Sequence, residues 1–204
     1  MPSAAERGNQ SFMSMLRTFI AVEIPTEMQQ NIYKETANIR KSLDALVRWV
    51  TVENMHLTLK FLGDVSPSSL EFLMQMLRNE AEAVPCFNIH LTGLGAFPSL
   101  KRPRVIYVGI QAPAALDTLQ RGIESACRRL GYEVEDRPFS AHLTLGRVKQ
   151  NISATDQQKI RHAIEGTQVD LPGTARVDSV HLYKSELKPS GSVYTRLYSA
   201  PLRK

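Results

Sequence analysis

The 204-residue chain has only two cysteines, Cys86 and Cys127, and they lack the spacing of a CxxC motif. A single possible pair makes no disulfide framework, so we expect buried free thiols in a reducing compartment. No apolar run approaches the roughly 20 residues that span a bilayer. The first 15 residues contain Glu6 and Arg7 and no apolar segment, unlike a secretory signal. These absences exclude a secreted disulfide scaffold and a helical membrane protein, and they predict a cytoplasmic protein.

Long runs of like charge are also absent, so the chain has no basic or acidic tail. The 25 Lys and Arg residues exceed the 20 Asp and Glu residues, giving a formal charge of +5. This excess suits a polyanionic partner without proving one. With 43% hydrophobic and 22% charged residues, the composition is that of a globular protein. We expect one domain over residues 16–204, preceded by a disordered extension over residues 1–15.

Hydrophobic periodicity and turn residues predict an alternation of helices and strands. The Leu and Met residues at 70, 73, 74 and 77 repeat at helical spacing and are typical of a core-facing helix. Strands are expected at 17–24, 48–50, 56–63, 87–97, 104–110, 142–149, 175–183 and 193–200, and helices at 26–43, 67–81, 114–130 and 153–164. Hairpins among these elements predict an α+β domain with antiparallel sheet and argue against a doubly wound parallel fold.

The tetrapeptide HLTL occurs twice, starting at His56 and at His142, 86 residues apart and in strand-like runs both times. Because side chains alternate along a strand, His56 and Thr58 point to one face, and Leu57, Leu59 and Phe61 point to the other. His142 and Thr144 repeat this pattern. If the two strands lie side by side around a pseudo-twofold axis, both His/Thr pairs face one groove.

Such a groove suits hydrolysis of a cyclic phosphodiester. One histidine takes a proton from the attacking water, while the other gives a proton to the leaving ribose oxygen. The threonine hydroxyls can donate hydrogen bonds to the phosphate oxygens that gain negative charge. This chemistry requires no metal or cofactor, and no His, Cys, Asp or Glu residues have metal-ligand spacing.

Three other histidines are interpreted as structural or surface residues. His90 begins a third His-Leu-Thr sequence, but Gly93 replaces the final Leu and no partner has matching spacing. His162 lies in a polar helical segment and His181 in a strand. The sequence therefore selects His56 and His142 as the reacting pair.

The paired tetrapeptides resemble the HxTx signature of the two-histidine (2H) phosphoesterase superfamily. Their surroundings resemble its RNA 2',3'-cyclic phosphodiesterase branch, also called 2'-5' RNA ligases. The similarity extends from Arg17 through most of the chain and includes RTFIAVEIP, NMHLTLKFLGDV, GLGAFPS, PRVIYVGI, FSAHLTLGRV and LYKSEL. The resemblance implies a bilobal, pseudo-twofold α+β fold, with antiparallel sheets lining a central groove and helices packed outside. It also implies that RNA with a terminal 2',3'-cyclic phosphate is the partner.

By the same resemblance, His56 and His142 are the acid/base pair, with His56 as acid, and Thr58 and Thr144 bind the phosphate. Arg147 is implied to contact the nucleotide, and Phe19 to line the base site. Strict alternation would turn Arg147 away from His142 unless Gly146 marks a bulge or the end of the strand. A surface charge for Arg147 and a core position for Phe19 are the structural alternatives. Alternation also puts Lys60 on the His56 face, where we expect a solvated rim charge.

We therefore expect a monomeric enzyme that hydrolyses the cyclic phosphate to a 2'-phosphate. Two alternatives lie within the same superfamily, namely ligation of RNA ends through a 2'-5' linkage and cleavage of 2'-5' linked oligonucleotides. An alternative of another class is a non-catalytic protein that binds RNA ends.

Overall fold

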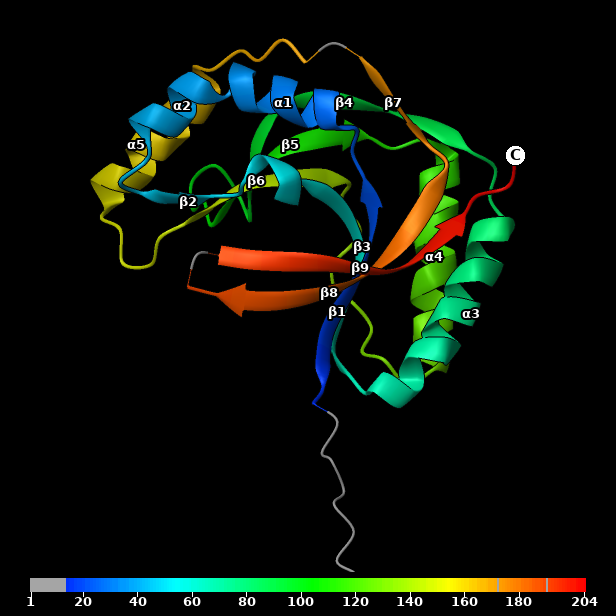
Figure 1. Cartoon of the computed structure of the whole chain (residues 1–204). Coiled ribbons are helices and arrows are strands. Elements are labelled where there is room, and N and C mark those ends of the chain that lie inside the picture. Colours follow the sequence, from blue (N-terminus) through cyan, green and yellow to red (C-terminus); the bar gives the residue numbers. More distant parts are fainter. Residues whose placement is uncertain (1–13, 172, 190) are drawn as a thin grey trace, which may run out of the picture.

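The computed structural model describes residues 14–171, 173–189 and 191–204 (Figure 1). Most of the extension expected over residues 1–15 lies outside the described residues. The strands are β1 (Leu16–Glu23), β2 (Val47–Trp49), β3 (His56–Val65), β4 (Phe87–Phe97), β5 (Val105–Gln111), β6 (His142–Val148), β7 (Thr174–Val177), β8 (Ser179–Lys188) and β9 (Gly191–Pro201). The α-helices are α1 (Thr26–Glu35), α2 (Ala37–Ser42), α3 (Leu70–Glu82), α4 (Ala114–Arg129) and α5 (Ala154–Glu165), and short 3-10 turns occupy Val52–Asn54 and Pro67–Ser69.

One antiparallel sheet carries the whole architecture, in the order β7-β4-β5-β6-β3-β1-β8-β9, with β2 added to β6. The order divides into two four-stranded halves that meet where β6 pairs with β3. The residues paired at this seam are Leu57 and Leu143, which occupy the same position in the two HLTL tetrapeptides. Equivalent residues that pair across a seam lie around a pseudo-twofold axis. The predicted α+β fold and its internal symmetry are confirmed.

The helices lie outside the sheet in two groups, α1, α2 and α5 in one and α3 and α4 in the other, and each group contains helices from both halves of the chain (Figure 1). Helices α3 and α4 pack together against β3, β8 and β9, while α2 and α5 pack together, with α5 against β4. The apolar stripe of α4 is fully buried at Leu116, Leu119 and Ile123. Leu57 and Leu143 are also fully buried, so the strands that carry the HLTL motifs are held from behind by core packing.

Two predicted elements are divided in the structure. The helix expected over 26–43 breaks at Thr36, whose side chain donates a hydrogen bond to the carbonyl of Ile32 at 2.7 Å. A threonine that bonds its own helix backbone favours such a bend. The strand expected over 175–183 is two strands, because β7 pairs with β4 and β8 pairs with β1. Asp178 separates them, so the chain crosses there from one half of the sheet to the other.

Both HLTL strands contain a bulge directly after the tetrapeptide threonine. In β3, Ala21 pairs with Thr58 and the next residue, Ile20, pairs with Lys60, which leaves Leu59 unpaired. In β6, Tyr107 pairs with Thr144 and Ile106 pairs with Gly146, which leaves Leu145 unpaired. An extra residue reverses the alternation of the side chains that follow it. The two residues directly after each bulge, Lys60 and Phe61 in β3 and Gly146 and Arg147 in β6, therefore point to the faces opposite to those that strict alternation predicts.

The bulge in β3 makes two predictions wrong. Phe61, expected in the core, is 58% exposed and lines the groove. Lys60, expected as a solvated rim charge, is only 5% exposed. Its Nζ donates to Glu124 Oε1 on α4 at 2.7 Å and to the carbonyl of Glu133. Glu124 Oε1 also accepts a bond from the backbone nitrogen of Glu135. Lys60 therefore attaches the segment before β6 to the back of β3.

Replacing Lys60 with Met is expected to lower the free energy of unfolding by roughly 2–4 kcal/mol, because Glu124 is left without its counter-charge in a largely buried position. Urea unfolding of the variant and the wild type measures the difference. The control is Arg161→Met, which removes an exposed pair between Arg161 and Glu165 on α5 and should cost less than about 0.5 kcal/mol. Equal stability of Lys60→Met and wild type would contradict the prediction.

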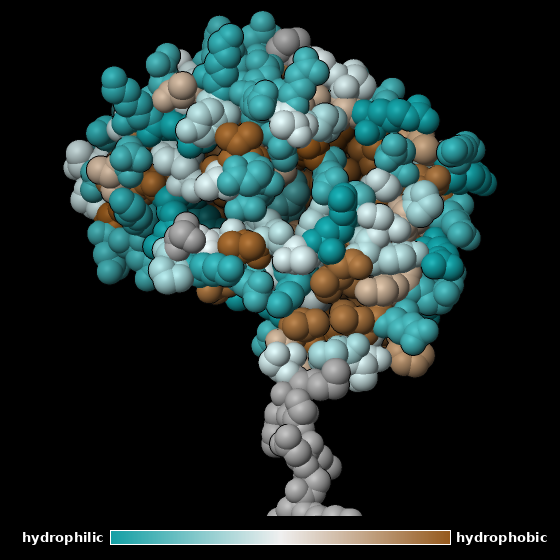
Figure 2. All heavy atoms as spheres, viewed as in Figure 1, coloured by the Kyte–Doolittle hydropathy of each residue, from teal (hydrophilic) through white to brown (hydrophobic). Residues whose placement is uncertain are grey.

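Polar side chains cover most of the molecular face in Figure 2, and apolar side chains gather there only in small patches. In the part of the chain that the structure describes, no helix combines the length and apolar character needed to cross a bilayer.

Candidate active site

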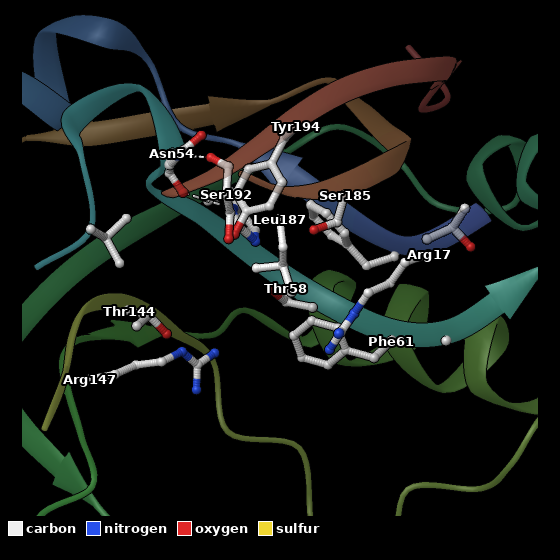
Figure 3. A pocket seen from close by; sticks show the side chains of 15 residues that line it. Arg17, Asn54, Thr58, Phe61, Thr144, Arg147, Ser185, Leu187, Ser192 and Tyr194 are labelled. Atoms are coloured by element: carbon white, nitrogen blue, oxygen red, sulfur yellow. Dashed lines mark hydrogen bonds between the residues drawn. The ribbon is translucent and has the colours of Figure 1, made fainter. Parts of the chain in front are cut away.

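The seam between β3 and β6 brings the two predicted His/Thr pairs into one groove. Two cavities lie along it. The first, of about 360 Å³, is lined by His56, Thr58, Thr144 and Arg147 among others. The second, of about 310 Å³, is lined by Thr58, His142, Thr144 and Arg147 among others. Figure 3 shows Thr58 on one side of the first cavity and Thr144 with Arg147 on the other. The two threonines are thus shared by these two cavities, of which the first is lined by His56 and the second by His142.

Both imidazoles are held by the same contact. His56 Nδ1 lies 2.8 Å from the carbonyl oxygen of Asn54, and His142 Nδ1 lies 2.7 Å from that of Ser140. A carbonyl oxygen only accepts hydrogen bonds, so Nδ1 carries the proton in each ring. This assignment leaves Nε2 of each ring available to accept or donate a proton. The carbonyl belongs in both motifs to the residue two positions before the histidine.

Aromatic rings pack against each histidine from behind. Phe19 stacks on His56 with ring centroids 4.8 Å apart, and Tyr194 meets the same imidazole edge-on at 5.2 Å. Phe97 and Tyr107 flank His142 at 4.8 and 5.5 Å. Such packing restricts the rotation of both imidazoles, which is what a fixed proton-transfer geometry requires.

Phe19 is only 3% exposed and forms a small core with Ala21 and Tyr183. The structure places it beneath His56, and it also lines the first cavity. That Phe19 also binds the base of the nucleotide stays a prediction. Its contacts directly support a role in orienting the imidazole of His56.

Burial lowers the pKa of both site histidines. For His56, desolvation is the main cause, the hydrogen bond to Asn54 opposes it, and the nearby His142 lowers the pKa further. For His142, desolvation is again the main cause, the bond to Ser140 opposes it, and Arg147 lowers the pKa further. Desolvation disfavours the charged imidazolium.

Arg147 reaches the groove because of the bulge at Leu145. The residue is exposed, and its side chain lies on the Thr144 side of the cavity (Figure 3). The bulge thus turns Arg147 toward the face that carries His142, which is the exception to strict alternation that the sequence left open. Gly146 allows the bulge to lie close to β2, since a Cβ there would come within 2.6 Å of Val47 Cγ1 and 2.8 Å of Trp49 Cε3. Phe61 and Arg147 occupy equivalent positions in the two halves. The groove is not symmetric at these positions, because one half has an aromatic ring where the other has a guanidinium group.

Several groove residues were not selected from the sequence. They are Arg17 and Phe61, the carbonyls of Asn54 and Ser140, and the aromatic residues Phe97, Tyr107 and Tyr194. A polar residue two positions before each histidine was a signal that could have indicated the carbonyl contacts. The aromatic residues come from β4, β5 and β9, and only strand pairing brings them to the motifs.

The remaining histidines lie outside these two cavities. His90 is exposed on β4, with Nδ1 3.2 Å from Thr174 Oγ1. His162 is exposed on α5, and His181 is buried on β8, where Nδ1 lies 2.8 Å from Ser199 Oγ. Cys86 and Cys127 are free, and burial raises the pKa of the Cys127 thiol to about 11. Among the described residues, no three His, Cys, Asp or Glu side chains come together as metal ligands.

A family model described as LigT like Phosphoesterase matches the chain twice in succession, over residues 22–107 and 108–194. The chain belongs to this LigT-like phosphoesterase family. Each of the two matches contains one HLTL motif, in agreement with the pseudo-twofold axis at the seam. The family belongs to the 2H phosphoesterases, as the resemblance of the motifs predicted.

Relatives in the family carry the name RNA 2',3'-cyclic phosphodiesterase. The protein of Methanothermobacter thermautotrophicus is 33% identical over 180 residues, which cover 88% of this chain and 95% of that protein. The protein of Thermotoga maritima is 30% identical over 184 residues, covering 90% and 94%. Among solved structures, E. coli LigT complexed with 3'-AMP has a TM-score of 0.74 and 26% identity, covering 93% of this chain and 99% of that one. A Thermus thermophilus protein has a TM-score of 0.76 and 27% identity, covering 92% and 98%.

Proposed function

We propose that this protein hydrolyses the terminal 2',3'-cyclic phosphate of RNA to a 2'-phosphate. The observation that carries the proposal is the placement of one histidine in each of two adjoining cavities, with Thr58 and Thr144 shared between them. Displacement at phosphorus requires the entering and leaving oxygens on opposite sides, so the base and the acid must lie apart with the phosphate between them. The names of the bacterial and archaeal relatives support the same substrate.

The chemistry can be assigned to this chain's own side chains. His142 Nε2 takes a proton from water as the water oxygen bonds to phosphorus. The bond from phosphorus to the 3'-oxygen breaks, and His56 Nε2 gives its proton to that oxygen, which leaves a 3'-hydroxyl and a 2'-phosphate. Hydroxyl groups of Thr58 and Thr144 and the guanidinium of Arg147 stabilise the negative charge on the other phosphate oxygens. None of these steps draws on a metal ion or a cofactor.

A second candidate function is transfer of the phosphoryl group to an alcohol, which would join RNA ends through a 2'-5' linkage. The observation in its favour is the size of the cavity beside His142, which at about 310 Å³ exceeds what one water molecule needs. Cleavage of a 2'-5' linkage is the reverse of this reaction and uses the same groups. A protein that binds RNA ends without turnover would need the groove, but it would not need two histidines that transfer protons.

An assay of the purified protein on an oligonucleotide with a 2',3'-cyclic phosphate, in the presence of EDTA, tests the proposal directly. We expect a 2'-phosphate end, separated from the 3'-phosphate isomer by chromatography, at the same rate with and without chelator. Loss of activity in EDTA that a divalent ion restores would contradict the mechanism. Binding without any product would favour the non-catalytic alternative.

The rate should depend on pH as a bell whose maximum lies below about pH 6.5, the ordinary pKa of histidine. One imidazole must be charged and the other neutral. The fraction of protein molecules in this protonation state is largest at the pH midway between the two pKa values. Because burial lowers both values, the midpoint also moves to lower pH. The profile of kcat/KM against pH on a cyclic phosphate measures it. A maximum above pH 8 would contradict the acid/base roles of these two histidines.

A further inference from the structure

The first cavity continues past the reacting groups to Arg17 at the start of β1. Arg17 and Arg147 are both exposed, and neither forms an ion pair or a side-chain hydrogen bond with another described residue. None of the described residues that line this cavity is Asp or Glu, whereas Glu124 and Glu135 line the cavity beside His142. A cavity with two arginines and no carboxylate attracts anions. One reacting phosphate beside Arg147 leaves the Arg17 guanidinium without an anion.

The position of Arg17 defines how far a second anion lies from the first. Its backbone pairs with Asp64, and its side chain extends along β3 toward Phe61 (Figure 3). From Thr58 to Phe61 is three residues, about 10 Å of strand and less with the bulge. This is about the length of one nucleotide in an extended strand. The exposed ring of Phe61 lines the same cavity as the two arginines and offers an apolar face on which a base or ribose can pack.

We propose that Arg17 binds the phosphate on the 5' side of the terminal nucleotide, while its 2',3'-cyclic phosphate lies between Thr58 and Thr144. The inference rests on the proposed function and narrows its substrate class. The preferred substrate is a nucleotide that carries a 5'-phosphate, either free or as the linkage to the rest of an oligonucleotide. A nucleoside 2',3'-cyclic phosphate occupies only the reacting half of the site.

The test compares adenosine 2',3'-cyclic phosphate with the same compound carrying a 5'-phosphate. Wild-type protein should show a kcat/KM about 10-fold or more higher for the phosphorylated compound, the effect of one charge-assisted contact. In Arg17→Met this ratio should fall to about 1, and Arg17→Lys should retain part of it because the charge remains. The control is Arg128→Met, which removes an equal charge from an exposed position on α4 outside the cavities and should keep the wild-type ratio.

The outcomes separate this inference from the function on which it rests. Equal kcat/KM of wild-type protein for the two compounds overturns the second phosphate site and leaves the hydrolytic function standing. A ratio that persists in Arg17→Met, or an equal loss on both compounds, also overturns it. If the protein hydrolyses neither compound, the result contradicts both the proposed function and the inference that rests on it. Circular dichroism and thermal unfolding of Arg17→Met should match those of the wild type, since the side chain is exposed.

Discussion

Replacing either His56 or His142 with Ala is expected to lower turnover of a 2',3'-cyclic phosphate by roughly 10²-fold or more, the usual contribution of one general acid or base. The two histidines line different cavities on either side of the threonines, so we expect that neither can take over the proton transfer of the other. Binding should weaken much less, because Thr58, Thr144 and Arg147 remain. Single-turnover rates and the affinity for a 2'-phosphate product measure the two effects separately.

His90→Ala provides the matched control, since it removes the same side chain from the third His-Leu-Thr sequence. His90 is exposed on β4 and lines neither cavity, so the turnover of this variant should equal that of wild type. His56→Asn and His142→Asn serve as further variants, because both imidazoles contact aromatic rings and Asn preserves more of this packing than Ala does. Near-normal turnover by a His142 variant would remove the second motif from the mechanism. A large loss in His90→Ala would mean that the wrong pair had been chosen.

A cyclic phosphate with a leaving group that departs without protonation should restore most of the activity of His56→Ala and little of that of His142→Ala. The general acid becomes dispensable once the leaving oxygen is a weak base, whereas activation of water is still required. The expected recovery approaches the whole loss of roughly 10²-fold that removal of the acid causes. Rates of both variants on the ordinary and the activated substrate, each divided by the wild-type rate, measure it.

Recovery in His142→Ala instead would exchange the two roles and keep the two-histidine mechanism. Equal failure of both variants would indicate that each histidine also binds phosphate. Thr58→Ala is a useful comparison, because a lost hydrogen bond to the phosphate oxygens should not be restored by a better leaving group. The role assignment rests on the resemblance of the motifs, since the Nδ1 atom of each ring makes the same contact with a backbone carbonyl.

Much of the candidate site was predictable because it is encoded in short, local patterns. HLTL places a histidine and a threonine on one face of a strand whichever fold contains it, and its repetition predicts a two-fold arrangement. The strand boundaries at the motifs agree closely with the hydrophobic pattern, as does the hairpin of β4 and β5. Selection of His56 and His142 over His90 also required only sequence, since His90 lacks a repeated partner.

Beyond the threonine of each motif, local patterns failed for a physical reason. Alternation predicts the facing of a side chain only while the pairing register is unbroken, and the bulges at Leu59 and Leu145 break it. For this reason Lys60 and Phe61 were assigned to the wrong faces. Gly146 indicated that a bulge could precede Arg147, whereas nothing in the sequence around Lys60 indicates a bulge.

By itself the sequence determined the α+β class and identified the two His/Thr pairs for which we propose acid/base chemistry, because these follow from residue type and from spacing within one strand. Tertiary structure decided which residues from distant strands surround the pairs. Pairing of Leu57 with Leu143 brings the motifs together, and strands β1 and β9 place Phe19 and Tyr194 on His56. Strand β1 also brings Arg17 to the cavity that His56 lines. These contacts depend on strand order and register over the whole sheet, and the free energy that selects them comes from burying the core common to all the strands.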